Sequence, residues 1–171
     1  MYAAAMANRL QPGDQAPKFS LSDQVGTQLS LSDFGGRRVL VYFYPKADTP
    51  GCTAQACGLR DALHDLNERP GATAAPAGKN VPAVLGISPD PPERQAAFDN
   101  KYELGFPLLS DEDHTVAEAY GVWVQRSMYG RSFMGIERSA FLVGPDGRLE
   151  EVWYKISPAA TAENLLKAVA S

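Results

Sequence analysis

The hydrophobic positions of this 171-residue chain change their period several times. Apolar and polar residues alternate at 19–22 and again at 28–31, on either side of a polar turn, which predicts an antiparallel hairpin. The run from Val39 to Tyr44 (VLVYFY) is almost continuously apolar and rich in β-branched and aromatic residues. Such a run is typical of a central strand that is covered on both faces.

Helical spacing begins after Pro50-Gly51. Apolar residues recur every three or four positions from there to Leu66, and the sequence Arg69-Pro70-Gly71 stops the pattern, so we expect a helix from about Cys52. The same reading predicts further strands at 81–88, 106–109, 139–143 and 148–154, and further helices at 32–34, 91–102, 111–120 and around 162–169.

Strands and helices alternate in the first half of the chain, and a hairpin and a helix close it. This order predicts an α/β fold in which helices flank both faces of a mixed sheet. We expect one domain over residues 11–171, preceded by a flexible extension at 1–10. The small, proline-broken segment 70–80 is predicted to be a flexible surface insertion, and 122–135 a loop that carries several aromatic residues.

Composition narrows the classes of function. The hydrophobic content of 44% is ordinary for a soluble globular protein, while the formal charge of −4 argues against a nucleic-acid partner. No apolar run approaches the roughly 18 residues that span a bilayer, and the N-terminus lacks the features of a secretory signal. We therefore expect a cytoplasmic protein with reduced or cycling thiols and without a membrane partner.

The chemistry concentrates where the first buried strand passes into a helix. Both cysteines of the chain, Cys52 and Cys57, lie there, and Cys52 follows Pro50-Gly51 near the expected helix start. The thiolate is the reactive form of cysteine, and the unpaired N–H groups at a helix N-terminus stabilise it. This position favours a reactive Cys52 over a buried structural cysteine.

Cys57 lies five residues after Cys52. On an ideal helix this offset puts the two Cα atoms roughly 8.7 Å apart, whereas a disulfide needs about 4.4–6.8 Å. Either Cys57 is a passive core residue, or the first turns of the helix unwind when a disulfide forms. A thioredoxin-type dithiol has two residues between its cysteines, not four, and two cysteines with the distant His64 and His114 are a poor zinc site.

The stretch Pro45-Lys46-Ala47-Asp48-Thr49-Pro50-Gly51-Cys52 resembles the active-site motif of peroxiredoxins: Pro, three residues, Thr, two residues, Cys. A second cysteine five residues on is similar to the bacterioferritin comigratory protein (PrxQ) subfamily. The likeness runs from about Leu10 to Val169. It includes the segments PGDQAP at 12–17, LSD at 109–111, YGVW at 120–123 and IERSAFLV at 136–143.

The resemblance implies a thioredoxin-like fold and a role for each matching residue. Cys52 would be the peroxidatic cysteine, Thr49 would hydrogen-bond the thiolate and the peroxide, and Pro45 would shield the site from water. Arg138 matches an invariant arginine that would keep Cys52 ionised and stabilise charge on the peroxide. Cys57 would be the resolving cysteine, closing an intramolecular disulfide that a thioredoxin-like partner reduces.

The resulting expectation is a monomeric thiol peroxidase for hydrogen peroxide and organic hydroperoxides, working without metal, haem or flavin. Two alternatives remain open. In a redox sensor or chaperone, unwinding on oxidation would expose a surface for a partner. A disulfide oxidoreductase without peroxide activity would reduce insulin even after replacement of Arg138.

Overall fold

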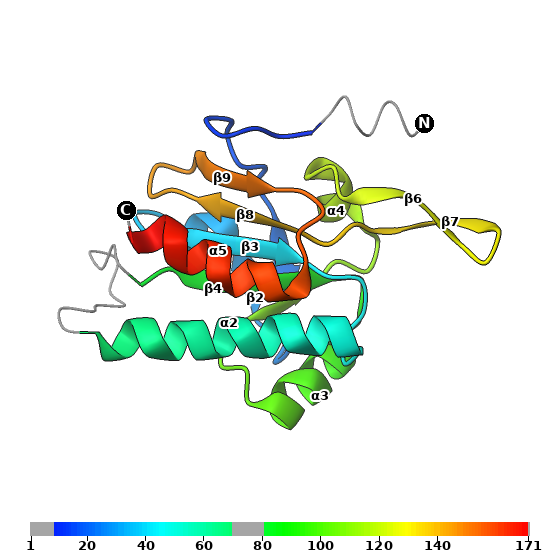
Figure 1. Ribbon diagram of the computed structural model, residues 1–171, viewed down its shortest axis with the longest axis horizontal. Coiled ribbons are helices and arrows are strands. Elements are labelled where there is room, and N and C mark those ends of the chain that lie inside the picture. The colour runs from blue at the N-terminus through cyan, green and yellow to red at the C-terminus, as the bar shows by residue number, and fades with distance from the viewer. Residues whose placement is uncertain (1–8, 70–80, 171) are drawn as a thin grey trace.

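A computed structural model describes residues 9–69 and 81–170, and its described part contains a mixed sheet of seven strands with a separate two-stranded hairpin (Figure 1). The order in the large sheet is β2-β1-β5-β4-β3-β8-β9. Its strands are β1 (Ser20–Ser22), β2 (Gln28–Ser30), β3 (Val39–Phe43), β4 (Ala83–Ser88), β5 (Leu108–Ser110), β8 (Ser139–Val143) and β9 (Leu149–Trp153).

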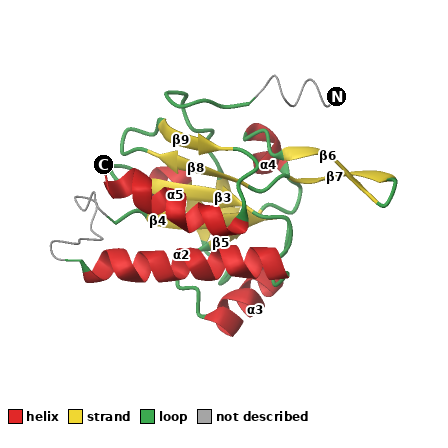
Figure 2. Cartoon of the chain, in the orientation of Figure 1, coloured by secondary structure: helices red, strands yellow, loops and turns green. Residues whose placement is uncertain are grey.

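Helices cover both faces of the large sheet (Figure 2). They are the 3-10 turn η1 (Leu31–Phe34), α2 (Pro50–Glu68), α3 (Pro92–Tyr102), α4 (Thr115–Ala119) and α5 (Pro158–Ala170). The side chains of α2, α3 and α5 join one buried cluster, and α4 packs into a second cluster on the opposite face.

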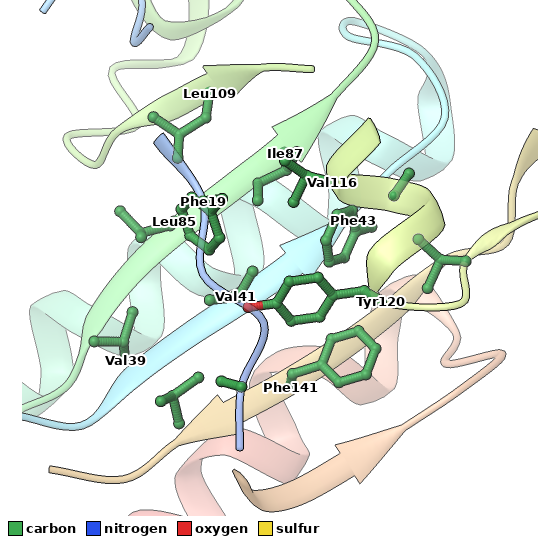
Figure 3. Packing of buried hydrophobic residues seen from close by; sticks show 14 of the residues in the cluster. Phe19, Val39, Val41, Phe43, Leu85, Ile87, Leu109, Val116, Tyr120 and Phe141 are labelled. Carbon is green, nitrogen blue, oxygen red and sulfur yellow. The ribbon is translucent and has the colours of Figure 1, made fainter. Parts of the chain in front are cut away.

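Strand β3 is buried along its whole length because it has a neighbour on both edges and a hydrophobic cluster on both faces. It pairs parallel with β4 and antiparallel with β8, where Phe43 is opposite Ser139. Figure 3 shows the cluster on the α4 face, in which Phe43 and Phe141 pack against the ring of Tyr120. The loop that leads into α2 therefore starts from the carboxyl end of an interior strand, between β4 and β8.

Most of the predicted elements are confirmed: the two hairpins of the large sheet, the central strand β3, and α2, α3 and α5. The sheet is mixed and has helices on both faces, as the pattern indicates. The helix α2 begins two residues earlier than expected, because Pro50 occupies its first position, where the absent N–H group costs nothing.

The predicted loop at 122–135 is wrong, because this segment forms the antiparallel hairpin of β6 (Trp123–Met128) and β7 (Arg131–Ile136). Its two-residue turn is Tyr129-Gly130, both with positive φ (54° and 76°). Because the first turn position is a tyrosine, the sequence lacks the Asn-Gly or Asp-Gly pair that usually indicates such a turn. Most side chains of the hairpin are also exposed, so no alternation between core and solvent marks the strands.

The predicted helix at 111–120 is shorter in the structure, beginning only at Thr115. The buried Asp111 carboxylate accepts the backbone N–H groups of Val116 (3.2 Å) and Ala117 (2.8 Å). The chain from Asp111 to His114 is a turn, in which His114 has a φ of 52°. The N-cap residue is His114, and the aspartate four residues before the helix start accepts the free N–H groups of the first turn in its place.

Two segments that carried predictions lie mainly outside the described residues. Residues 1–8 of the expected N-terminal extension and the whole expected insertion 70–80 are not described. Arg9 and Leu10, the last residues of that extension, bond to the body: Arg9 pairs with Glu137 at 2.6 Å, and Leu10 N donates to the Tyr154 hydroxyl at 3.0 Å. Among the described helices, none has the length and apolar character to cross a membrane.

Candidate active site

The candidate site is built on the N-terminus of α2. Thr49 is the N-cap residue, and Cys52 is the third residue of the helix. Although it lies so close to the helix end, the Cys52 side chain is only 1% exposed. The free N–H groups of the first turn and the helix dipole favour negative charge at this position. The predicted placement of Cys52 at a helix start is confirmed.

Arg138 meets Cys52 from a distant part of the chain. It lies between β7 and β8, and its Nη2 atom is 3.5 Å from the Cys52 sulfur. A guanidinium at this distance can donate a hydrogen bond to a thiolate, and its positive charge attracts the thiolate. Gly51 permits the approach, since a Cβ atom there would lie 3.1 Å from Arg138 Nη2. The structure thus brings together the two residues on which the predicted chemistry depends.

The second nitrogen of this guanidinium is held by Gln55. Arg138 Nη1 donates to Gln55 Oε1 at 2.7 Å, and Gln55 Nε2 donates to the Thr161 hydroxyl of α5 at 2.9 Å. Both Gln55 and Thr161 are fully buried. Gln55 was not among the site residues predicted from the sequence, although its spacing offered a signal: a residue three positions after Cys52 lies on the same face of the helix.

The loop between β3 and α2 is tied to α3 and to the β4–α3 connection. Ala47 N donates to the Asp90 carboxylate at 2.7 Å. Asp48, which has a φ of 60°, accepts from Lys101 Nζ at 3.0 Å and from the Tyr102 hydroxyl at 3.0 Å. The hydrogen bond from Lys101 lowers the pKa of the Asp48 carboxyl. These contacts hold the backbone that leads into Cys52.

A buried polar network lies behind this loop. The Tyr44 hydroxyl donates to Gln95 Oε1, and Gln95 Nε2 donates to the Ser88 hydroxyl at 2.9 Å. Ser88 donates in turn to Asp90 at 2.7 Å, which closes the chain of bonds back to the loop. Burial raises the pKa of Tyr44 well above its usual range, so this phenol stays a hydrogen-bond donor.

Thr49 and Pro45 have the positions expected for loop residues. The Thr49 hydroxyl donates to the Lys46 carbonyl at 2.8 Å, so its proton points along the loop rather than toward Cys52. Its oxygen lone pairs remain able to accept a hydrogen bond. Pro45 is exposed where the chain leaves β3. The predicted roles of both residues toward the thiolate, the peroxide and water stay predictions.

Cys57 lies further along the same unbroken helix. It is half-buried and packs against the cluster that contains Cys52. Both thiols are free, and α2 is helical through both positions. At the roughly 8.7 Å between Cα atoms that ideal helix geometry gives for this offset, the two sulfurs cannot bond without a change of backbone.

An open pocket of about 440 Å³ lies beside Arg138, between the base of the β6–β7 hairpin and the segment after β9. Its lining is rich in cations and is formed by Val124, Gln125, Arg126, Ser127, Glu137, Arg138, Lys155 and Ile156. Within residues 9–69 and 81–170, no three His, Cys, Asp or Glu side chains are grouped to hold a metal ion.

Comparison with known proteins yields close relatives over most of the chain. A model of the AhpC/TSA family matches residues 12–152. The chain is 53% identical over 146 residues to peroxiredoxin Bcp of Escherichia coli, covering 85% of this chain and 86% of that protein. It is 49% identical over 148 residues to a putative peroxiredoxin of Haemophilus influenzae, with 86% and 88% covered.

A solved structure of the bacterioferritin comigratory protein of Xanthomonas campestris has the same fold. Its TM-score to this chain is 0.76 at 34% identity, covering 89% of this chain and 90% of that one. The predicted α/β thioredoxin-like fold with an N-terminal hairpin is thereby confirmed.

Proposed function

The chain belongs to the AhpC/TSA family as a peroxiredoxin of the Bcp (PrxQ) subfamily, a thiol peroxidase, and we propose that Cys52 is its peroxidatic cysteine. One observation carries this assignment: the buried Cys52 sulfur at a helix N-terminus, 3.5 Å from Arg138 Nη2. Both features favour the thiolate, which is the nucleophile that a peroxide requires.

In the proposed reaction, the Cys52 thiolate attacks the terminal oxygen of the hydroperoxide. The S–O bond forms as the O–O bond breaks, so Cys52 becomes a sulfenic acid and the leaving oxygen departs as water or an alcohol after gaining a proton. Arg138 donates to the peroxide oxygens as negative charge moves onto them. The Thr49 oxygen accepts a hydrogen bond from the hydroperoxide O–H, while the Thr49 hydroxyl continues to donate to the Lys46 carbonyl.

The substrates follow from the family. Peroxiredoxins reduce peroxides, and alkyl peroxide reduction is the activity named for the X. campestris relative. We extend this to the present chain as a peroxidase for hydrogen peroxide and organic hydroperoxides. Pro45 would limit the access of water to the sulfur, as its place in the motif implies.

Cys57 is the proposed resolving cysteine. Its thiolate attacks the sulfenic sulfur of Cys52, releases water and leaves an intramolecular disulfide. Because both residues belong to one helix, the first turns of α2 have to unwind for this step. A thioredoxin-like dithiol then reduces the bond. A resolving thiol in the same chain needs no second subunit, which supports a monomer.

Two measurements test the proposal. With thioredoxin, its reductase and NADPH present, hydrogen peroxide should drive NADPH consumption, and Cys52→Ser should abolish it. After one equivalent of peroxide, the intact mass should fall by two hydrogens in a single chain. Oxidation without turnover would instead indicate a redox sensor. Insulin reduction that persists in Arg138→Met, with no peroxide activity in the unaltered protein, would indicate a disulfide oxidoreductase.

A further inference from the structure

The β6–β7 hairpin concentrates the exposed hydrophobic surface of the molecule. Among the described residues, five large hydrophobic side chains are exposed, and four of them lie on this hairpin. Tyr129, in the turn, is 96% exposed; Met128, Met134 and Phe133 are 57%, 49% and 43% exposed. In Figure 1 the hairpin projects away from the sheet and the helices. A projecting apolar segment of this kind marks a binding surface.

The hairpin is also cationic. Residues 123–136 contain Arg126 and Arg131 but no aspartate or glutamate, in a chain whose formal charge is −4. Strand pairing places Arg126 opposite Phe133 and Met128 opposite Arg131, so cations and apolar side chains alternate on one face of the hairpin. Met134, opposite Gln125, lies on the other face.

We propose that this hairpin docks on an anionic lipid surface, with Tyr129, Met128 and Phe133 entering the interfacial region. Arg131 contacts lipid headgroups, and Arg126, whose Nη1 donates to the Ile136 carbonyl at 2.9 Å, adds positive charge nearer the base of the hairpin. Arginine attracts anionic lipid, and tyrosine is favoured where an apolar layer meets water. The sequence predicts no membrane partner because no run is long enough to span a bilayer, but a surface contact does not need one.

The arrangement of the side chains favours lipid over the other possible occupants. In a symmetric dimer through this face, the arginines of both copies would come together, with no carboxylate in either hairpin to compensate them. A protein bound to one face would leave the apolar residue of the other face in water. A lipid surface surrounds the tip and contacts both faces.

The contact would bring lipid close to the peroxidatic site. Strand β7 ends at Ile136, two residues before Arg138. The pocket beside Arg138 is lined in part by Gln125, Arg126 and Ser127 of the hairpin. Hydroperoxides formed in a bilayer would thus meet the enzyme at the surface from which they arise. Lipid binding itself does not depend on the proposed cysteine chemistry.

Vesicle sedimentation of the full chain tests the proposal. The protein should sediment with vesicles of phosphatidylglycerol and phosphatidylcholine, but not with phosphatidylcholine alone. Salt of about 1 M should release it, because the screening length falls to about 3 Å. Arg131→Gln should weaken binding about fivefold, the typical contribution of one arginine near an anionic surface. Absence of sedimentation, or equal sedimentation with both vesicle types, would overturn the proposal.

The apolar contribution is tested by Tyr129→Asn with Phe133→Thr, which suit the turn and the strand and should weaken binding by about tenfold or more. Val25→Thr is the matched control, since Val25 is 79% exposed but lies in the β1–β2 turn and should leave binding unchanged. Thermal melts confirm that each variant folds. A concentration-dependent dimer that the double variant abolishes would assign this face to a second copy and refute the proposal.

Discussion

Replacing Gln55 by leucine tests whether the position of the Arg138 guanidinium controls the reactivity of Cys52. Gln55 is fully buried and joins Arg138 Nη1 (2.7 Å) to the Thr161 hydroxyl (2.9 Å). Leucine has a similar volume but neither an acceptor nor a donor. Arg138 would keep its contact with the sulfur through Nη2 and lose the bond that fixes the other side of its guanidinium plane.

The expected magnitude follows from that one bond. A hydrogen bond to a charged group contributes about 1.5–3 kcal/mol. If the lower half of this range is lost in the transition state, the rate constant for Cys52 oxidation falls about 10- to 40-fold, at about 1.4 kcal/mol for each factor of ten. Thr161 still donates to the Ser157 carbonyl (3.0 Å), so the fold should lose only about 1–2 kcal/mol.

The assay isolates the first chemical step. In a Cys57→Ser background, rapid mixing with hydrogen peroxide, followed by quenching and intact mass, gives the second-order rate constant for formation of the sulfenic acid. Gln24→Leu is the control, because the Gln24 amide likewise bonds through both its nitrogen and its oxygen, in three hydrogen bonds to Asp99, Phe106 and Leu108, none of which involves Arg138 or Cys52. It should reduce the free energy of unfolding without slowing oxidation.

Gln55→Glu separates position from charge. Its carboxylate keeps an acceptor for Arg138 but adds a negative charge beside the guanidinium, which reduces the positive potential at the Cys52 sulfur. Cys52 oxidation in Gln55→Glu should therefore be slower than in the unaltered protein, although Arg138 keeps its acceptor. If Gln55→Leu oxidises within twofold of the unaltered protein, the bond from Gln55 does not position Arg138 for the reaction and this reasoning is refuted.

Three further predictions concern resolution, unwinding and alkaline stability. Cys57→Ser should undergo one round of oxidation but lose thioredoxin-dependent turnover; an unchanged steady-state rate would place resolution elsewhere. Oxidation to the Cys52–Cys57 disulfide should lower helicity and speed amide exchange in the first turns of α2, and identical exchange in both redox states would contradict the unwinding. Burial raises the pKa values of Tyr42, Tyr44 and Tyr120, so the folded state binds more protons than the unfolded state above about pH 10. Stability should be full below that pH and fall above it by about 1.4 kcal/mol per pH unit for each tyrosine, and equal urea midpoints at about pH 9 and pH 11 would contradict this.

Local features of the sequence determined much of this protein. The apolar run at 39–44 identifies β3, because a short run that is apolar at every position and rich in β-branched and aromatic residues is typical of a strand covered on both faces. Pro50-Gly51 places Cys52 at a helix start, and the offset of five residues makes an intact helix incompatible with a Cys52–Cys57 disulfide. These conclusions need only the neighbouring residues, since helix and strand periods are properties of the local backbone.

Apart from the family resemblance, which pointed to Arg138, only the tertiary structure shows which distant groups meet Cys52. Arg138 follows it by 86 residues, and no period or spacing links the two. The antiparallel register of β3 and β8, with Phe43 opposite Ser139, sets Arg138 beside the end of β3, where α2 begins. Gln55 becomes a partner of Arg138 only through that register. The β6–β7 hairpin was likewise not predicted. The alternation of hydrophobic and polar residues marks a strand only where one face is buried, and most side chains of this hairpin are exposed to solvent.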